Sequence, residues 1–197
     1  MDQRTIDTYN QKAKEYDYET LGFWEEFPRS FIDRFVSLTK GKVLNIGSGP
    51  GRDGLLLKER GLDVTCLDAS EAMVKICKDK GFNAVLGDFL EVPFKDDSFT
   101  AIWAYTSLLH VSKKDVDKAL GEVVRVLEKD GIFGFGMIEG DSEEYKESPG
   151  IDLPRLFSKY KREELEDLLK EHHFKILYLE EFKPRKNNYL NFICQKI

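Results

Sequence analysis

From Lys42 onward, short apolar runs alternate with segments of helical spacing, and this alternation constrains the fold more than any other feature of the sequence. Helical patterns cover 52–60, 70–80 and 113–127. The strand-like runs between them are "KVLNI" (42–46), "DVTCL" (63–67), "NAVLG" (83–87), "FTAIWAY" (99–105) and "IFGFGMI" (132–138). Strands that alternate with helices in this way predict βαβ units, and therefore a parallel sheet with helices on both faces.

The end of the chain departs from this rhythm. After a helical segment over 161–171, two strand-like runs follow each other directly, "FKILYLEEF" (174–182) and "NYLNFICQK" (188–196). Only the short polar stretch "KPRKN" joins them, and so short a connection permits only an antiparallel hairpin. We therefore expect a mostly parallel sheet whose last strand is antiparallel.

Two segments lie outside this core. A chain of 197 residues suits a single domain, which we expect over 1–197 with an α/β core over 40–197. Residues 1–38 are predicted to form a helical cap of two helices, the second rich in aromatic residues. Residues 139–157 are charged and show no clear periodicity, and a loop this long in a compact domain is typically a lid or a binding loop.

Charge and cysteine usage exclude several classes of partner. A net charge of −6 argues against nonspecific binding to nucleic acid or to an anionic membrane surface. The N-terminal stretch is polar, and no apolar run is long enough to cross a bilayer. Cys66, Cys77 and Cys194 lie far apart in apolar runs, which predicts reduced thiols in a cytoplasmic protein and no metal site.

The stretch "VLNIGSGPGRDG" (43–54) joins a strand to a helix through a glycine-rich turn of the kind that presents backbone N–H groups to a ligand. A phosphate loop needs Lys and then Ser or Thr after its last glycine, whereas this chain has Arg52 and Asp53. A dinucleotide turn fits only partly, because its third glycine position is Arg52 and the glycine comes one residue earlier, at Gly51.

Two carboxylates follow the next strands. Asp68 ends the second strand-like run, where a carboxylate can accept hydrogen bonds from both hydroxyls of a ribose. Asp88 ends the third, where it can accept from an adenine amino group, while the backbone N–H of Phe89 faces a ring nitrogen. Together with the glycine turn, these residues predict a nucleoside ligand, either NAD or S-adenosylmethionine.

Over residues 40–196 the sequence resembles the class I S-adenosylmethionine-dependent methyltransferases. The stretches that carry the resemblance are the glycine turn, "VTCLDASEAMVKICK", "GDFLEVPFKDDSFTAIWAYTSLLHV", "ALGEVVRVLEKDGIFGF" and the final hairpin, in this order and spacing. The resemblance implies a Rossmann-like sheet of seven strands whose antiparallel last strand lies beside the fifth and sixth. "SLLHV" and "PRLFSKY" are similar to a small-molecule subgroup of the family.

The same resemblance implies a cofactor site. It places Gly47, Ser48, Gly49 and Gly51 along the methionine portion of the cofactor. The ribose lies beside Asp68, Ala69 and Met73, and the adenine is held by Asp88 and Phe89. The floor beside the sulfonium is closed by Ala104 and Tyr105, and the cofactor is covered by Tyr9 and Tyr16. Asn45 departs from the family, which usually has an acid there that organises the turn and balances the sulfonium charge. The competing interpretations are purely structural: glycines that serve packing, a turn carboxylate at Asp88 and a core methionine at Met73.

His110 follows the fourth strand at the edge of the sheet where substrates bind in open α/β folds. It is either a general base for an acceptor that holds a proton or a histidine that only packs. Arg155 either clamps an acidic substrate or the lid, or it is simply a solvated side chain. The lid acids Glu139, Asp141, Glu143, Glu144 and Glu147 either attract a cationic amine or simply keep the loop soluble.

These observations predict an enzyme that transfers a methyl group from S-adenosyl-L-methionine to a small-molecule acceptor by in-line displacement. An amino-methyltransferase of DNA is disfavoured, because "WAYTSLLHV" replaces the Asn/Asp-Pro-Pro-Tyr/Phe motif after the fourth strand. Two alternatives stay open at this point. One is an NAD-dependent oxidoreductase, and the other is a binding module that keeps the cofactor without catalysis.

Overall fold

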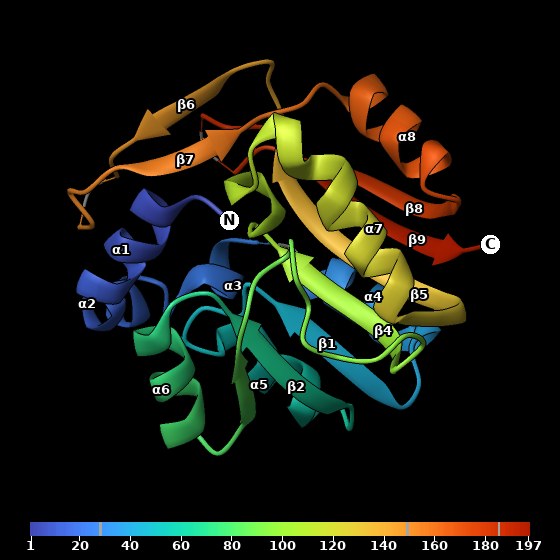
Figure 1. Cartoon of the computed structure of the whole chain (residues 1–197), viewed down its shortest axis with the longest axis horizontal. Helices are drawn as coiled ribbons and strands as arrows, with labels where there is room; N and C mark the ends of the chain where they lie inside the picture. Colours follow the sequence, from blue (N-terminus) through green and yellow to red (C-terminus); the bar gives the residue numbers. More distant parts are fainter. Residues whose placement is uncertain (28, 149, 185) are drawn as a thin grey trace.

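The computed structural model describes residues 1–27, 29–148, 150–184 and 186–197. Residues 28, 149 and 185 fall outside this description; they belong to the expected cap, lid and terminal connection. Seven strands form one sheet in the order β3-β2-β1-β4-β5-β9-β8 (Figure 1). Their bounds are β1 Lys42–Ile46, β2 Asp63–Asp68, β3 Asn83–Leu86, β4 Phe99–Tyr105, β5 Leu127–Ile138, β8 Phe174–Phe182 and β9 Tyr189–Lys196.

The pairing of these strands confirms the predicted fold class. β1 pairs in parallel with β2 and β4, β2 with β3, and β4 with β5. The last strand, β9, pairs antiparallel with both β5 and β8, so the terminal hairpin inserts β9 between them. This arrangement is the Rossmann-like sheet with an antiparallel last strand that the connection lengths predicted.

Helices cover both faces, because successive strand residues point to opposite sides of a sheet. One hydrophobic cluster joins Leu44 and Ile102 of the sheet to residues of the helices α7 and α8, and the other joins Val43 and Trp103 to residues of α4 (Arg29–Leu38), α5 and α6. The bounds of the core helices are α5 Arg52–Glu59, α6 Glu71–Asp79, α7 Val116–Val126 and α8 Arg162–Glu171, with short 3-10 turns η1 Leu108–His110 and η2 Lys113–Asp115.

The N-terminal segment contains four helices rather than the two expected. They are α1 Gln3–Gln11, α2 Ala13–Glu19, α3 Phe23–Glu26 and α4 Arg29–Leu38. The first break lies at Lys12, which leaves the helical region with φ −112° and ψ 18°. The aromatic helix is broken at Phe27, which is extended with φ −104° and ψ 147°. A residue that precedes proline avoids helical backbone angles, and this explains the second break.

The charged stretch 139–157 also differs from expectation, since it contains strand structure. β6 Glu143–Lys146 and β7 Arg155–Ser158 pair antiparallel and form a separate two-stranded sheet. Figure 1 shows this hairpin beside α1, and α1 also contacts α6. We call residues 143–158 the lid hairpin. None of the helices in the described ranges is long and apolar enough to cross a membrane.

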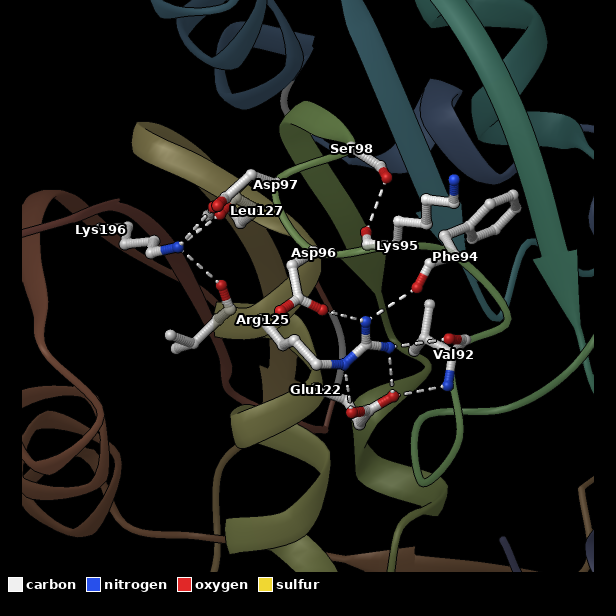
Figure 2. Close-up of polar contacts among 11 residues, drawn as sticks. Val92, Phe94, Lys95, Asp96, Asp97, Ser98, Glu122, Arg125, Leu127 and Lys196 are labelled. Atoms are coloured by element: carbon white, nitrogen blue, oxygen red, sulfur yellow. Dashed lines mark hydrogen bonds and ion pairs between the residues drawn. The ribbon is translucent and has the colours of Figure 1, made fainter.

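The connection from β3 to β4 carries two predicted site residues, and α7 holds it in place (Figure 2). Arg125 donates from Nη2 to the carbonyl of Val92 at 2.9 Å and from Nη1 to the carbonyl of Phe94 at 2.8 Å. The same guanidinium binds Glu122, whose Oε2 accepts from the backbone N–H of Val92 at 2.8 Å. Buried or half-buried charge-assisted bonds of this kind fix loop geometry strongly.

Candidate active site

The glycine turn lies at the carboxyl end of β1 in a conformation that its sequence makes accessible. Gly47, Gly49 and Gly51 have φ values of 63°, 53° and 83°, the left-handed region that glycine adopts without a steric penalty. At Gly47 the fit is especially tight, because a Cβ there would lie 2.3 Å from the Cβ of Ser107. Ser107 itself donates to the carbonyl of Ile46 at 2.8 Å, so the loop after β4 closes against the turn.

Asp68 connects the turn to the end of β2. Its Oδ2 accepts from the backbone N–H of Gly49 at 2.8 Å, and its Oδ1 accepts from that of Ser70 at 2.9 Å. Ser70 caps α6 through its own hydroxyl, which accepts from the backbone N–H of Met73. Burial raises the pKa of Asp68 to about 6 against the opposing effect of these hydrogen bonds. Each carboxylate oxygen keeps a lone pair for a further donor.

The third strand contributes a second carboxylate to the same region. Asp88 Oδ1 accepts from the backbone N–H of Leu90 at 2.7 Å, and its Oδ2 lies 2.7 Å from the amino group of Met1. Phe89 is 1% exposed and packs into the cluster that faces α7. Asp88 is therefore already a hydrogen-bond acceptor for an amino group in this structure.

A chain of polar contacts links α1, η1 and the lid hairpin. His110 Nδ1 donates to the carbonyl of Leu156 at 2.5 Å, because a carbonyl can only accept. His110 Nε2 is therefore the acceptor for the hydroxyl of Tyr9 at 2.9 Å, and the Tyr9 oxygen accepts in turn from Arg155 Nη1 at 3.0 Å. Burial, and then the positive charge of Arg155, lower the pKa of His110 to about 3, so its ring is neutral at physiological pH.

These side chains surround one cleft, which we call the main cleft. The predicted site residues that line it are Tyr9, Tyr16, Gly47, Ser48, Gly49, Asp68, Ala69, Met73, Asp88, Phe89, Tyr105 and His110. Two predicted residues lie behind its wall. Gly51 serves packing, since a Cβ there would lie 3.0 Å from the ring of Phe82, and Ala104 belongs to the core that faces α7.

Sequence reasoning missed part of the lining of the main cleft: Met1, Ile46, Pro50, Arg52, Asp53, Gly87, Thr106 and Ser107. Arg52 is the most significant of these, since it puts a cation next to the glycine turn. Its Nε binds Asp53 Oδ1 at 2.6 Å, and Asp53 also accepts from the indole N–H groups of Trp24 and Trp103 at 2.8 and 3.0 Å. "GRDG" contained both residues, but no local pattern places two distant indoles on Asp53.

Asn45, the departure from the family pattern, is 1% exposed in the middle of the sheet. Its Nδ2 has no hydrogen-bond partner among the described residues. An unpaired buried amide destabilises the fold by about 1–3 kcal/mol. The side chain therefore brings neither a charge nor a complete set of hydrogen bonds to the strand that precedes the glycine turn.

A further cavity, which we call the side cavity, adjoins the main cleft. Both cavities are lined by Tyr9, Tyr16, Thr106 and His110, which we call the shared wall. Thr106 has a φ of 52°, an outlier for a β-branched residue, and its backbone N–H donates to the carbonyl of Gly136 at 3.0 Å. Strain of this kind clusters at functional sites.

Comparisons with known proteins bear on the family and the fold of the chain. A family model described as a methyltransferase domain matches residues 44–135. An uncharacterized methyltransferase of Staphylococcus carnosus is 29% identical over 191 residues, which cover 93% of this chain and 88% of that protein. Further methyltransferases are among the curated proteins that match. One of them, a demethylmenaquinone methyltransferase of Renibacterium salmoninarum, is 29% identical over 62% of this chain and 54% of its own length.

Solved structures share the fold. An S-adenosylmethionine-dependent methyltransferase of Aquifex aeolicus is 18% identical with a TM-score of 0.71, covering 94% of this chain and 98% of that one. The 1,6-didemethyltoxoflavin-N1-methyltransferase of Burkholderia thailandensis, solved with its substrate and S-adenosylhomocysteine, is 20% identical with a TM-score of 0.65 over 93% of this chain and 87% of its own. Residues 44–135 thus match a methyltransferase domain, and the chain shares the fold of S-adenosylmethionine-dependent methyltransferases.

Proposed function

We propose that the methyl acceptor of this enzyme is a small molecule that binds in the side cavity and receives the methyl group across the shared wall. The observation that carries the proposal is the pair of adjoining cavities with four residues in common. One cavity has the glycine turn and two carboxylates that suit a nucleoside, and the lining of the other combines aromatic rings with charged side chains. A methyl group at the boundary would meet an acceptor without crossing bulk solvent.

The main cleft fits S-adenosylmethionine on two observations. The glycine turn approaches Ser107 so closely that any Cβ at Gly47 would fill the space, and Asp68 keeps lone pairs toward the cleft. We assign the methionine portion to the turn beside Arg52, the ribose to Asp68 with Ala69 and Met73, and the adenine to Asp88 and Phe89. In this assignment the adenine amino group takes the place beside Asp88 that the amino group of Met1 occupies.

When bound, the cofactor supplies a methyl carbon activated by a sulfonium, so the protein contributes mainly positioning and exclusion of water. Positioning alone can lower such a barrier by about 7–11 kcal/mol. Tyr9, Tyr16 and Tyr105 cover or floor the reaction space. We assign His110, which the sequence predicted as a base, to positioning instead: its neutral Nε2 accepts from the hydroxyl of Tyr9, and a pKa of about 3 makes the ring too weak a base to take a proton at neutral pH.

A calorimetric titration tests the cofactor assignment. We expect micromolar binding of S-adenosylmethionine and S-adenosylhomocysteine, and affinity at least about tenfold weaker in Asp68→Ala, because charge-assisted hydrogen bonds to the ribose are lost. Asp63→Ala is the matched control, since Asp63 lies exposed at the other end of β2. Binding of NAD alone, or of none of these compounds, would contradict the assignment.

The acceptor class has its own test. The enzyme, given cofactor with a labelled methyl group, is incubated with a cell lysate that has been divided by ultrafiltration. We expect label to accumulate in the low-mass fraction and not in protein or RNA. His110→Ala is expected to lower kcat with little change in the KM for the cofactor. Label confined to macromolecules would refute a small-molecule acceptor.

A further inference from the structure

Arg155 is a buried cation that forms no ion pair with any residue of the described ranges. It opens β7 in the wall of the side cavity and is 6% exposed. Its Nη1 donates to the hydroxyl of Tyr9 at 3.0 Å and its Nη2 to the hydroxyl of Ser148, both neutral groups. Its Nε is buried and has no hydrogen-bond partner in the described part of the chain. Arginine is rarely buried to this extent without a carboxylate or phosphate nearby.

The lid acids do not supply the missing charge. Glu144 already takes two lysines, with Lys146 at 2.8 Å and Lys159 at 3.3 Å. Glu143 accepts from the backbone N–H of Lys113 and from the hydroxyl of Ser158. Glu139 accepts from the side chain of Asn188. Three of the five lid acids are therefore bound by groups of the protein itself and are not gathered to attract a cationic amine; of the other two, Glu147 lines the side cavity.

The side cavity is accordingly cationic. Its described lining holds the positive side chains Lys146, Arg155 and Lys159 and a single acid, Glu147. Glu144 binds both lysines and offsets part of their charge, so the charge that stays unpaired is that of Arg155. A positive sulfonium on the other side of the shared wall would add to this charge. An acceptor that carries a negative charge would offset both, whereas a cationic acceptor would be repelled by both.

Aromatic rings lie next to the unpaired guanidinium. Its central carbon stands 5.4 Å from the ring centre of Tyr9 and 5.3 Å from that of Phe157. Tyr16 and Phe23 line the same cavity. Such walls favour a flat, apolar body attached to the charged group.

We propose that the methyl acceptor is an organic anion with a flat apolar body, anchored in the side cavity through its carboxylate or phosphate by Arg155. The proposal rests on the side cavity being the acceptor site, as inferred above. The anionic group serves as the anchor, and the body reaches from it toward the shared wall, where Tyr9 and His110 lie. Arg155 is therefore a substrate-binding residue that determines specificity.

Four probes with the same ring and different head groups test the anchor: benzoate, phenyl phosphate, benzamide and benzylamine. Each is titrated into protein saturated with S-adenosylhomocysteine. We expect one or both anions to bind at least about tenfold more tightly than benzamide, and benzylamine to bind most weakly. Tighter binding of benzoate identifies a carboxylate anchor, and tighter binding of phenyl phosphate identifies a phosphate anchor.

Variants separate the anchor from general charge. Arg155→Gln is expected to abolish the preference for anions, and Arg155→Lys to keep part of it. Arg4→Gln makes the same change in charge at an exposed position, where Arg4 stacks on Tyr145 of the lid hairpin, and should keep the preference. Circular dichroism checks that each variant folds, and the head-group preference of the unaltered protein stands whether or not Arg155→Gln folds.

The outcomes that overturn the proposal are distinct from failure of the proposed function. Equal binding of benzamide, tighter binding of benzylamine, no binding of any probe at millimolar concentration, or an anion preference that survives in Arg155→Gln would each refute it. Failure of S-adenosylhomocysteine to bind in the first step would instead refute the cofactor assignment. The two proposals therefore fail in different measurements.

Discussion

At the scale of single residues, Gly47 illustrates how closely the main cleft is built. A residue with a Cβ would meet two penalties there: a left-handed φ of 63° and a Cβ contact of 2.3 Å with Ser107. The φ penalty alone is about 1–2 kcal/mol, and overpacking adds about 1–3 kcal/mol. We predict that Gly47→Ala lowers the free energy of unfolding by several kcal/mol and abolishes binding of S-adenosylhomocysteine, as measured by urea unfolding and calorimetry.

Gly61→Ala separates the two penalties. Gly61 has a similar φ of 85°, but no heavy atom lies within 4 Å of the position that its Cβ would take. This variant should therefore show the φ penalty alone and bind S-adenosylhomocysteine normally. Equal destabilisation of the two variants would mean that the turn and the loop of Ser107 relax freely away from each other.

His110 gives a prediction for pH. Its pKa is lowered from 6.5 to about 3 by burial, so between these values the unfolded chain binds a proton that the folded chain does not. Above about pH 6.5 the neutral ring of His110 costs the folded state nothing. As the pH falls from 6.5 toward 3, the free energy of unfolding decreases because only the unfolded chain gains the proton. The slope is on the order of 1.4 kcal/mol per pH unit within this window.

Titration of Asp68 changes the free energy of unfolding with the opposite sign over part of this pH range. The effect of His110 on stability must therefore be measured as a difference between the unaltered protein and a variant. The raised pKa of Asp68, about 6, lets the folded chain keep a proton that the unfolded chain loses between pH 3.8 and 6. We predict that the stability gap between the unaltered protein and His110→Gln narrows by about 1–2 kcal/mol from pH 6.5 to 5. His172→Gln, measured in parallel, is the control for the same substitution at a histidine outside the cleft, where His172 contacts Asp117.

At the scale of elements, the Arg125 contacts of Figure 2 hold the β3–β4 connection against α7. The guanidinium also binds Asp96 Oδ1 at 2.9 Å, so it joins two backbone carbonyls and two carboxylates. We predict that Arg125→Gln lowers the free energy of unfolding by about 2 kcal/mol. It should also weaken binding of S-adenosylhomocysteine, since Asp88 and Phe89 lie on this connection.

Arg162→Gln is the matched control. Arg162 also contacts two carboxylates, those of Glu166 at 2.7 Å and Glu181 at 3.1 Å, but it lies on the exposed face of α8 and holds no backbone carbonyl. Exposed ion pairs of this kind contribute about 0–1 kcal/mol. Comparable losses in the two variants would show that the backbone contacts of Arg125 add little.

Elements of the core were predictable because their signals are local and repeated. Each core strand is an apolar run, and the terminal hairpin follows from a connection too short for anything else. The lid hairpin escaped prediction because β6 is mostly charged and shows no apolar alternation. Glu144 binds Lys146 of the same strand, and Glu143 accepts from the hydroxyl of Ser158 on β7. β5 begins at Leu127, earlier than expected, because Asp130 at φ 62° forms a bulge inside the strand.

The residues of the site likewise divide into those that local sequence signals predicted and those that depend on distant contacts. The glycine turn and Asp68 were predictable, since carboxyl ends of neighbouring parallel strands meet at one edge of the sheet. Arg155 was left open, because its burial depends on α1 and the lid hairpin closing over it, which no local pattern encodes. The shared wall likewise joins residues about a hundred positions apart in the chain, as the contact of Tyr9 with His110 illustrates.

At the scale of the whole molecule, α1 and the lid hairpin form one cover over the two cavities. The backbone N–H of Leu156 donates to Thr5 Oγ1 at 2.9 Å, and Thr8 Oγ1 donates to the carbonyl of Pro154 at 2.7 Å. On its other side, α1 holds α6, where Asn10 accepts from the hydroxyl of Ser70 at 2.8 Å. Because Tyr9 of this cover lines both cavities, we infer that ligands reach them when α1 and the hairpin move together.

Thr5→Val tests this coupling, because it keeps the shape of the side chain while leaving the N–H of Leu156 without an acceptor. The change also removes the hydrogen bond that Thr5 Oγ1 donates to Asp2 Oδ1 at 2.7 Å. Loss of the buried hydrogen bond to Leu156 should by itself favour local opening about tenfold, equivalent to about 1.4 kcal/mol. We predict that hydrogen exchange accelerates together in 3–11 and 143–158, while β1 and β4 keep their protection. S-adenosylhomocysteine should slow exchange in both segments, and Thr65→Val, a change on β2 away from the cover, should leave them unaltered. Faster exchange in the hairpin alone would show that the two segments open independently, and the route into the side cavity would then depend on the hairpin without α1.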